Sequence, residues 1–205
     1  MPSSSTRTFL ENASQRYNEE ITAEGVEYLT GRGIEPETIE TFRLGVVADP
    51  LPGHEPYRGF LAIPYLTPSG SVTSIRFRRL SGDGPKYLTV AGDIPRIYNT
   101  AALERGTRGI CICEGELDAI IAEQCGLPAV GIPGAAAWQK VWVRLFEPYD
   151  QVMTLSDDDE AGRAFVTKLA KALGNVRDVP MAGGDVTTFF LTHGGDALRR
   201  KVLGK

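Results

Sequence analysis

Two short apolar runs in this chain end at acidic residues, and each is followed by a helical pattern. Glu114 comes after the run at 110–113, and four consecutive acids at 157–160 come after the run at 152–155. Short, continuous apolar runs followed by helix signals are typical of buried strands. The carboxyl ends of neighbouring parallel strands converge on one crevice. The repeated order of strand, acid and helix therefore predicts an α/β fold with its acids gathered there.

Carboxylates that converge on one crevice repel one another unless a cation lies among them. Hard oxygen ligands on short side chains suit Mg²⁺, so the acids predict a divalent-metal site. The alternative for residues 157–160 is helix capping, because acidic side chains complement the dipole of a helix N-terminus. For Glu116 and Asp118 we expect positions in the first turn of a helix, facing water.

This part of the chain resembles the Toprim domain, the metal-binding unit shared by bacterial-type primases, topoisomerases of types IA and II and some nucleases. The family pattern is a glutamate after the first strand and Asp-x-Asp after the third, usually followed by a small residue and Gly. Here Glu114, Asp157 and Asp159 take those places, ahead of Gly162. The resemblance implies that these three acids bind Mg²⁺ or Mn²⁺ and act in catalysis. The middle residue, Asp158, leaves open which two of the three aspartates hold the metal.

Composition sets the class of protein. The chain has 205 residues, 42% of them hydrophobic, which is enough for one large domain or two small lobes. No apolar stretch approaches the length of a membrane span, and residues 1–8 look like a disordered tail rather than a signal peptide. Three cysteines without ligand spacing favour a reducing cytoplasm and no zinc site. We therefore expect a cytoplasmic protein with no membrane association.

Charge is distributed unevenly. The net charge of −4 argues against general nucleic-acid binding, but the segment 58–108 is basic, and such a split suits phosphates on one wall and metal ions on the other. Alternation in the strand expected at 72–80 places Arg76 and Arg78 on one face. That face is either an ordinary solvated sheet surface or a track for a nucleic-acid backbone. The basic residues of the segment are Arg58, Arg76, Arg78, Arg79, Lys86, Arg96, Arg105 and Arg108.

The remaining pattern predicts a helical, then hairpin-rich, first part and a regular βα second part. Expected helices lie at 9–31, from Pro36 to about residue 42, at 100–105, 117–125, 138–146 and 162–173, and expected strands at 60–65, 72–80, 97–99, 110–113, 128–132, 151–155 and 175–180.

Residues 28–105 are similar to the lobe that precedes Toprim in bacterial replicative primases. The resemblance implies that Arg58, Arg78 and Lys86 contact template and nucleotide phosphates. The matching pieces are Tyr28-Leu29-x-x-Arg32-Gly33-Ile34, Phe42-Arg43-Leu44-Gly45, Arg58-Gly59-Phe60, Ile63-Pro64-Tyr65, Gly70-x-Val72, Arg78, Pro85-Lys86-Tyr87-Leu88 and Ile97-Tyr98-Asn99.

A further primase-like segment follows the Toprim pattern. Gly183-Gly184-Asp185-Val186 resembles a Gly-x-Asp-Pro-x segment, which implies that Asp185 is another metal-site acid. The next acid of that segment is absent, because Thr187 and Thr188 stand there. The resemblance therefore implies a second metal that is held weakly.

Together these patterns predict a fold and a function. We expect an α/β Toprim domain at 108–205, with a central, mostly parallel sheet flanked by helices, preceded by a smaller basic α+β primase-type lobe at 9–107. The resemblance to DnaG-type primases implies a phage-like nucleotidyltransferase that makes short RNA primers from ribonucleoside triphosphates on single-stranded DNA during DNA replication. Two alternatives stay open: a non-catalytic, nucleic-acid-binding or replisome-regulating module, and a metal-dependent Toprim nuclease.

The sequence also suggests partners. No cysteine-rich zinc ribbon precedes residue 25, no Walker A motif is present, and no helicase motor fits after the Toprim pattern. A replicative helicase and a separate zinc-ribbon protein are therefore the further partners to expect.

Overall fold

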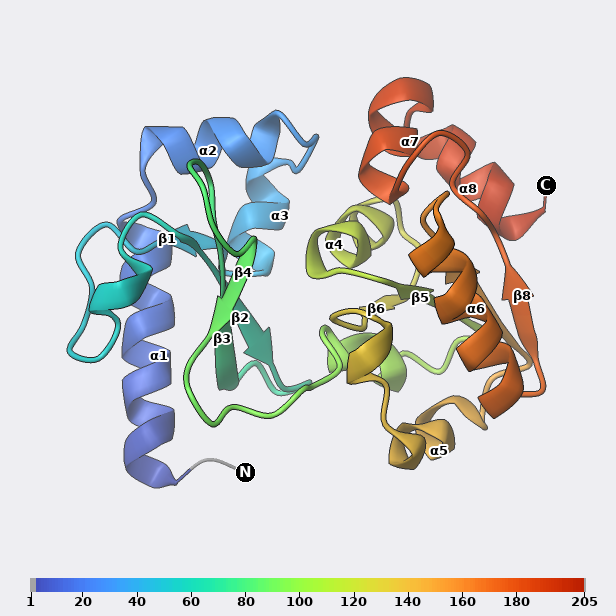
Figure 1. The fold of residues 1–205 in the computed structure, drawn as a ribbon, viewed down its shortest axis with the longest axis horizontal. Coiled ribbons are helices and arrows are strands. Elements are labelled where there is room, and N and C mark those ends of the chain that lie inside the picture. Colours follow the sequence, from blue (N-terminus) through green and yellow to red (C-terminus); the bar gives the residue numbers. More distant parts are fainter. Residues whose placement is uncertain (1–2, 205) are drawn as a thin grey trace. The chain divides into compact units, whose positions relative to one another are not determined.

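The computed structural model describes residues 3–204 and divides into two compact units, residues 1–94 and 95–205 (Figure 1). The boundary lies earlier in the sequence than the expected one after residue 107. The segment that differs belongs to the second unit because Tyr98 forms a β-bridge with Gly131. No helix among residues 3–204 is long and apolar enough to cross a membrane.

The second unit is built on a parallel sheet. Its strands follow the spatial order β6-β5-β7-β8, and every neighbouring pair is parallel. This confirms the expected α/β class with a parallel sheet. The strands are β5 (Gly109–Cys113), β6 (Ala129–Gly131), β7 (Gln151–Leu155) and β8 (Val176–Asp178).

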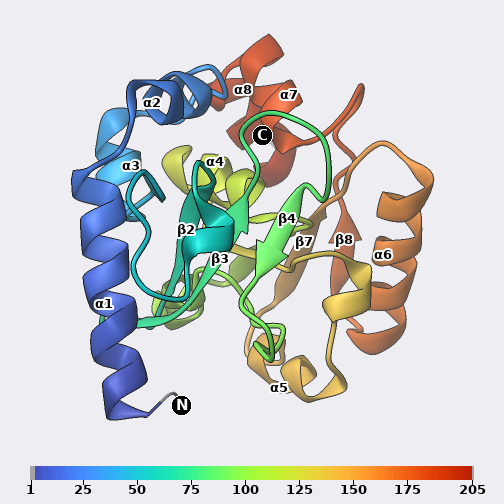
Figure 2. The same ribbon diagram turned by 60° about the vertical axis from the view of Figure 1, so that its left-hand side comes forward.

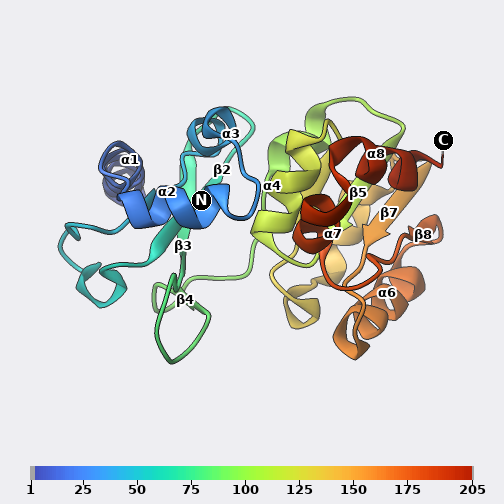
Figure 3. The same ribbon diagram turned by 90° about the horizontal axis from the view of Figure 1, so that it is seen from above.

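Helices cover both faces of this sheet. Helices α4, α7 and α8 lie on one side and α6 on the other (Figure 3). The single helix expected at 138–146 is wrong, because the structure has a 3₁₀ turn at Lys140–Trp142 and then one short helix. Two β-branched valines in this stretch lower its helix propensity. The helices are α4 (Glu116–Gln124), α5 (Val143–Phe146), α6 (Glu160–Ala172), α7 (Val186–His193) and α8 (Gly195–Leu203).

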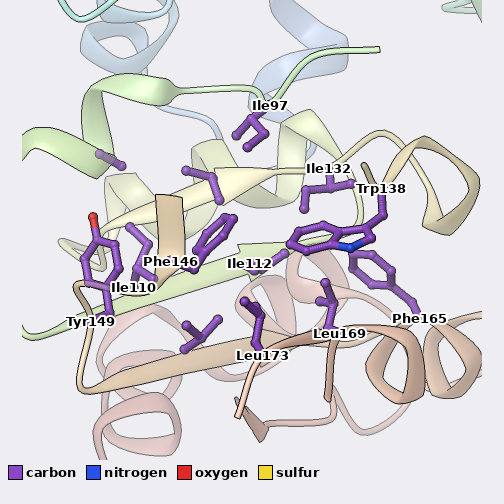
Figure 4. Close-up of a cluster of buried hydrophobic side chains, with 13 residues drawn as sticks. Ile97, Ile110, Ile112, Ile132, Trp138, Phe146, Tyr149, Phe165, Leu169 and Leu173 are labelled. Atoms are coloured by element: carbon purple, nitrogen blue, oxygen red, sulfur yellow. The ribbon is translucent and has the colours of Figure 1, made fainter. Parts of the chain in front are cut away.

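The core between the sheet and α6 is apolar. Ile110 and Ile112 alternate along β5 and point to the same side, where Phe165 and Leu169 of α6 meet them (Figure 4). All four side chains are fully buried. Burial of each such side chain contributes about 1.5–3 kcal/mol, so this contact fixes α6 and the loop before it against the strand ends.

The first unit holds an antiparallel sheet in the order β1-β2-β3-β4. Helix α1 lies along this sheet (Figure 2) and buries Leu10, Ala13 and Tyr17 against it. The elements are α1 (Ser4–Glu19), α2 (Ala23–Thr30), α3 (Pro36–Thr41), β1 (Gly45–Val46), β2 (Leu61–Leu66), β3 (Val72–Arg78) and β4 (Tyr87–Thr89).

The N-terminal helices differ from the sequence expectation. Helix α1 begins at Ser4, inside the expected tail at 1–8, because the Ser3 hydroxyl caps it by accepting a hydrogen bond from the Thr6 N–H at 3.2 Å. Residues 1 and 2 lie outside the described part of the chain. The single helical pattern expected at 9–31 is two helices, because Thr22 caps the start of α2.

A buried histidine joins the loop before β2 to α1. His54 is 3% exposed, and its Nδ1 lies 2.9 Å from the hydroxyl oxygen of Tyr17. That oxygen also accepts a hydrogen bond from the Leu51 N–H, so the Tyr17 hydroxyl links the His54 ring to the backbone of the same loop. Burial lowers the pKa of His54, and the neighbouring Glu55 offsets this only in part. Burial in the folded unit therefore favours the neutral form of the His54 ring.

We expect the free energy of unfolding to fall as the pH drops below 6.5, the ordinary pKa of histidine. The unfolded chain takes up a proton there that the folded chain excludes, which costs up to about 1.4 kcal/mol per pH unit. Denaturant unfolding between about pH 5 and 8 measures this dependence. His54→Asn should lose this component, whereas His193→Asn, at an exposed position, should keep it. Equal pH dependence in the native chain and His54→Asn would contradict the assignment.

Candidate active site at the strand ends

The parallel pairing of β5 with β7 brings the two acidic segments together. Cys113, the last residue of β5, pairs with Leu155, the last residue of β7. Glu114 and Asp157 leave the sheet just beyond this pair, and the Asp157 N–H donates a hydrogen bond to Glu114 Oε1 at 3.2 Å. The expected convergence of Glu114 and Asp157 at the carboxyl ends of the strands is therefore present in the fold.

Among the acids at the strand ends, Asp157 is the one whose negative charge its surroundings disfavour most. Its Oδ1 atom is buried and has no hydrogen-bond partner among the described residues. Burial, and then the charges of Glu114, Asp118, Asp185 and Asp159, raise its pKa to about 7. Without a cation or a proton, Asp157 is a carboxylate in a site that resists its charge.

Glu114 shares this environment. Burial raises its pKa, and the charges of Asp159, Asp118 and Asp178 act in the same direction. The hydrogen bond from the Asp157 N–H opposes them by stabilising the carboxylate. The hydrogen bond holds the Glu114 carboxylate in one orientation, and the raised pKa makes this carboxylate easier to protonate than an ordinary glutamate.

Two of the expected metal-site acids are also helix caps. Asp159 Oδ1 accepts a hydrogen bond from the Gly162 N–H at 2.7 Å at the start of α6. Asp185 Oδ1 accepts one from the Thr188 N–H, also at 2.7 Å, at the start of α7. Helix capping thus explains the position of one carboxylate oxygen of Asp159 and one of Asp185. It does not explain the buried position of Asp157.

The acids after Glu114 do not face water as expected. Glu116 is 1% exposed, so that expectation is wrong. Asp118 is half-buried, and its Oδ1 accepts hydrogen bonds from the Thr187 N–H at 3.1 Å and the Thr187 hydroxyl at 2.8 Å. Asp118 is the site residue that sequence reasoning missed. The available signal was Thr187 itself, a hydroxyl donor where the resemblance implies an acid.

The donor set suits a hard divalent cation. The available groups are oxygen atoms of Asp157, Glu114 and Asp159, and the unpartnered Asp157 Oδ1 is a ready ligand atom. Within residues 3–204, no three His, Cys, Asp or Glu side chains already stand in the arrangement of a finished metal centre. A cation would therefore have to draw these carboxylates closer.

The cysteines offer no thiolate ligand. Burial raises the pKa of Cys111 to about 12 and that of Cys113 well above its ordinary value. Both side chains, like Cys125, are buried free thiols. A neutral thiol is a poor zinc ligand, because zinc binds the thiolate form.

Gly162 makes the close approach of α6 possible. A Cβ atom at this position would lie 2.2 Å from the carbonyl oxygen of Asp157 and 2.9 Å from Glu114 Oε1. Only a residue without a side chain allows the first turn of α6 to pack against both acids. The glycine in the Asp-x-Asp-x-x-Gly pattern is thus explained by space at the site.

The expected phosphate-binding residues lie in the first unit and differ in exposure. Arg58 is exposed and donates to the Ala48 carbonyl at 2.7 Å. Lys86 is exposed, and Arg76 is half-buried with its guanidinium 4.1 Å from the centre of the Tyr87 ring. Arg78 is only 5% exposed. Arg76 and Arg78 share a side of β3, as the alternation predicts, but they do not form an open solvated face.

The fold and acids of the second unit define a Toprim-like domain, and the Toprim-like family model matches residues 111–187. The Gene 57 protein of Mycobacterium phage D29 is 48% identical over 151 residues, covering 71% of this chain and 99% of the relative. The DNA primase of Treponema pallidum is 29% identical and covers 88% of this chain. This chain spans 37% of the length of that primase.

Solved structures agree on the fold. The RNA polymerase domain of Mycobacterium tuberculosis primase DnaG has a TM-score of 0.83 at 21% identity, covering 99% of this chain and 84% of that domain. A DnaG primase catalytic domain bound to single-stranded DNA has a TM-score of 0.77 at 18% identity, covering 97% and 80%. The chain belongs to the family of the phage D29 Gene 57 protein, and its fold is that of DnaG-type primase catalytic domains, with a Toprim-like match at residues 111–187.

We expect Asp157→Asn to raise the free energy of unfolding in metal-free buffer at about pH 8, by about 1–2 kcal/mol after allowance for solvent screening. The native carboxyl, with its pKa near 7 against an ordinary 3.8, is ionised there at a cost that the amide avoids. Addition of Mg²⁺ should stabilise the native chain and leave Asp157→Asn unchanged. Thermal unfolding of both, beside Asp158→Asn, measures the effect. If Mg²⁺ stabilises Asp157→Asn as much as it stabilises the native chain, Asp157 is not a metal ligand.

We expect Gly162→Ala to lower the free energy of unfolding by about 1–3 kcal/mol, because the new methyl group collides with the Asp157 backbone. Gly174→Ala is the matched control, since a Cβ atom there meets nothing within 4 Å. Denaturant unfolding compares the two. A Gly162→Ala variant as stable as Gly174→Ala would show that α6 does not depend on this close approach.

Proposed function

We propose that this chain is a DNA primase-type nucleotidyltransferase, a DNA-directed RNA polymerase that makes short RNA primers on single-stranded DNA with Mg²⁺ or Mn²⁺. The observation that carries the proposal is the pair of Glu114 and Asp157 at adjacent parallel strand ends, with Asp157 Oδ1 buried and unpartnered among the described residues. Support comes from the primase relative and from the primase catalytic domains of the same fold, one of them bound to single-stranded DNA.

The proposed reaction joins a 3′-hydroxyl to the α-phosphorus of a ribonucleoside triphosphate. A new P–O bond forms, the bond to pyrophosphate breaks, and the hydroxyl gives up its proton. A bound divalent cation would supply charge neutralisation for the triphosphate and alignment of the hydroxyl. Asp157 and Asp159 would hold this cation, with Asp185 assisting. Glu114 is the candidate acceptor of the hydroxyl proton or a further ligand, since its pKa is raised by burial.

The basic residues of the first unit supply phosphate binding in this proposal. Arg58 and Lys86 are exposed and Arg76 is half-buried, so each can reach a phosphate from solvent. Guanidinium groups bind phosphate through paired N–H donors, and lysine binds it as a point charge. Single-stranded DNA and ribonucleoside triphosphates are the ligands proposed for this set. A replicative helicase and a zinc-ribbon protein are proposed as protein partners, acting in the bacterial cytoplasm.

One observation favours a second candidate, a non-catalytic nucleic-acid-binding module. Thr187 occupies the place of an acid and binds Asp118 through both its N–H and its hydroxyl. A threonine in place of an acid leaves the site with one negative charge fewer, and its hydrogen bonds occupy one oxygen of Asp118. A chain with too few free carboxylates would bind nucleic acid without polymerising.

Incorporation of labelled ribonucleotides on single-stranded DNA tests the proposal. With Mg²⁺ or Mn²⁺, the native chain should make short RNAs. Asp157→Ala and Asp159→Ala should lower this activity by at least about a hundredfold. Without these ligands the divalent cation that would neutralise the charge of the triphosphate is lost.

The same reactions contain the controls. Asp158 is exposed, and within residues 3–204 its carboxylate accepts a hydrogen bond from the Gly183 N–H alone. Asp158→Ala should therefore retain most activity if Asp158 is not a metal ligand. Shortened DNA in place of new RNA would indicate a nuclease. Bound DNA with no product under either metal would indicate the binding module and overturn the proposal.

A further inference from the structure

Arg78 in the first unit is a buried cation held by two tyrosines. It is 5% exposed. Its Nε donates a hydrogen bond to the Tyr28 hydroxyl oxygen at 2.5 Å, and its Nη1 donates one to the Tyr87 hydroxyl oxygen. No carboxylate among the described residues pairs with it. Burying a guanidinium is costly unless it is hydrogen-bonded, so the two tyrosine hydroxyls are what allows this charge to lie inside the unit.

The two tyrosine rings carry further cations. The Arg32 guanidinium lies 4.9 Å from the centre of the Tyr28 ring, and the Arg76 guanidinium lies 4.1 Å from that of Tyr87. Arg78 itself lies within 5.7 Å of the first ring and 5.1 Å of the second. Each ring therefore lies close to the buried cation and to one further, half-buried arginine.

A fourth cation and one unsatisfied atom complete the cluster. The ammonium group of Lys86 lies 5.9 Å from the centre of the Tyr87 ring. The Nε atom of Arg32 is buried and has no hydrogen-bond partner among residues 3–204. Four like charges around two rings repel one another, and the repulsion is relieved when a polyanion binds. Phosphate is the anion whose geometry matches guanidinium donors.

We propose that Arg78 is a positioning residue rather than a phosphate ligand. Held by the hydroxyls of Tyr28 and Tyr87, it fixes the two rings that present Arg32, Arg76 and Lys86 to the phosphates of a polyanion. The proposal rests on the proposed function, which supplies two sources of such phosphates, the DNA template and the ribonucleoside triphosphate.

The geometry explains why Arg78 acts through its neighbours. Two of its nitrogen atoms already donate to tyrosine hydroxyls, and its side chain has almost no contact with solvent. Tyr28 lies in α2, Arg78 in β3 and Tyr87 in β4, so the two hydrogen bonds join three elements of the unit. Loss of the hydroxyls would free the rings and, with them, the outer cations.

Removal of the two hydroxyls tests this role without changing any charge. The double variant Tyr28→Phe with Tyr87→Phe should bind a single-stranded DNA oligonucleotide roughly tenfold more weakly, measured by fluorescence anisotropy in EDTA so that no reaction occurs. Arg78→Gln should weaken binding to a similar extent. Combining all three changes should add little, because the hydroxyls and Arg78 act as one unit.

The dependence on salt separates positioning from direct contact. If Arg78 touches a phosphate, Arg78→Gln should reduce the slope of log K against log salt by about 0.7. Native-like binding by the double tyrosine variant, together with such a change in slope for Arg78→Gln, would overturn the proposal.

Tyr57→Phe controls for general loosening of the unit. Its hydroxyl donates to the Thr89 carbonyl at 3.2 Å and touches none of the four cations. It should bind DNA like the native chain even if its melting temperature falls. An equal loss of affinity in Tyr57→Phe would assign the effect to general destabilisation and overturn the proposal.

A parallel titration with a ribonucleoside triphosphate identifies the source of the phosphates. A weaker interaction only with DNA assigns the cluster to the template, and one only with the triphosphate assigns it to the nucleotide. Either result supports the positioning role. If the native chain makes primers and the tyrosine variants bind both ligands normally, the positioning role of Arg78 is wrong and the proposed function stands. A native chain that binds neither ligand sinks the proposed function as well.

Discussion

The alignment of β5 with β7 is the constraint on which the acidic site depends. Their parallel register places Cys113 beside Leu155, so the residues just beyond both strands have to meet. The hydrogen bond from the Asp157 N–H to Glu114 at 3.2 Å is the direct result. A shift of one residue in either strand would turn its side chains to the other face and separate the acids. The apolar core of the second unit therefore sets the spacing of its carboxylates.

This arrangement concentrates negative charge where the fold gives it little solvent. Helix N-termini relieve part of the repulsion, since Asp159 and Asp185 each cap a helix. Thr187 relieves another part by donating two hydrogen bonds to Asp118. Asp157 receives no such compensation at its buried Oδ1. The local structure thus leaves one defined position where a cation would lower the energy of the folded chain.

The sequence predicted the features that depend on local order along the chain. The two strand-and-acid segments that carry Glu114 and Asp157 follow from apolar runs and helix signals, because strand ends in a parallel sheet share an edge. The burial of Glu116 and Arg78 could not be read in this way. Each depends on side chains from other elements, such as the Tyr28 hydroxyl that meets Arg78. In the segment at 138–146 the apolar spacing predicted one helix, although the β-branched valines that lower its helix propensity were also present in the sequence.

The two units solve opposite electrostatic problems in the same way. The second unit holds several carboxylates close together at its strand ends. The first unit buries Arg78, and no carboxylate among residues 3–204 is paired with it. Buried charges are costly unless they are paired or hydrogen-bonded; at Arg78 two tyrosine hydroxyls supply hydrogen bonds, whereas the buried Oδ1 of Asp157 has no such partner among the described residues. A divalent cation would offset the charge of the carboxylates, and phosphates would offset that of Arg32, Arg76 and Lys86 around the buried Arg78. Divalent metal ions and phosphate groups are both components of phosphoryl transfer, the reaction class proposed for this chain.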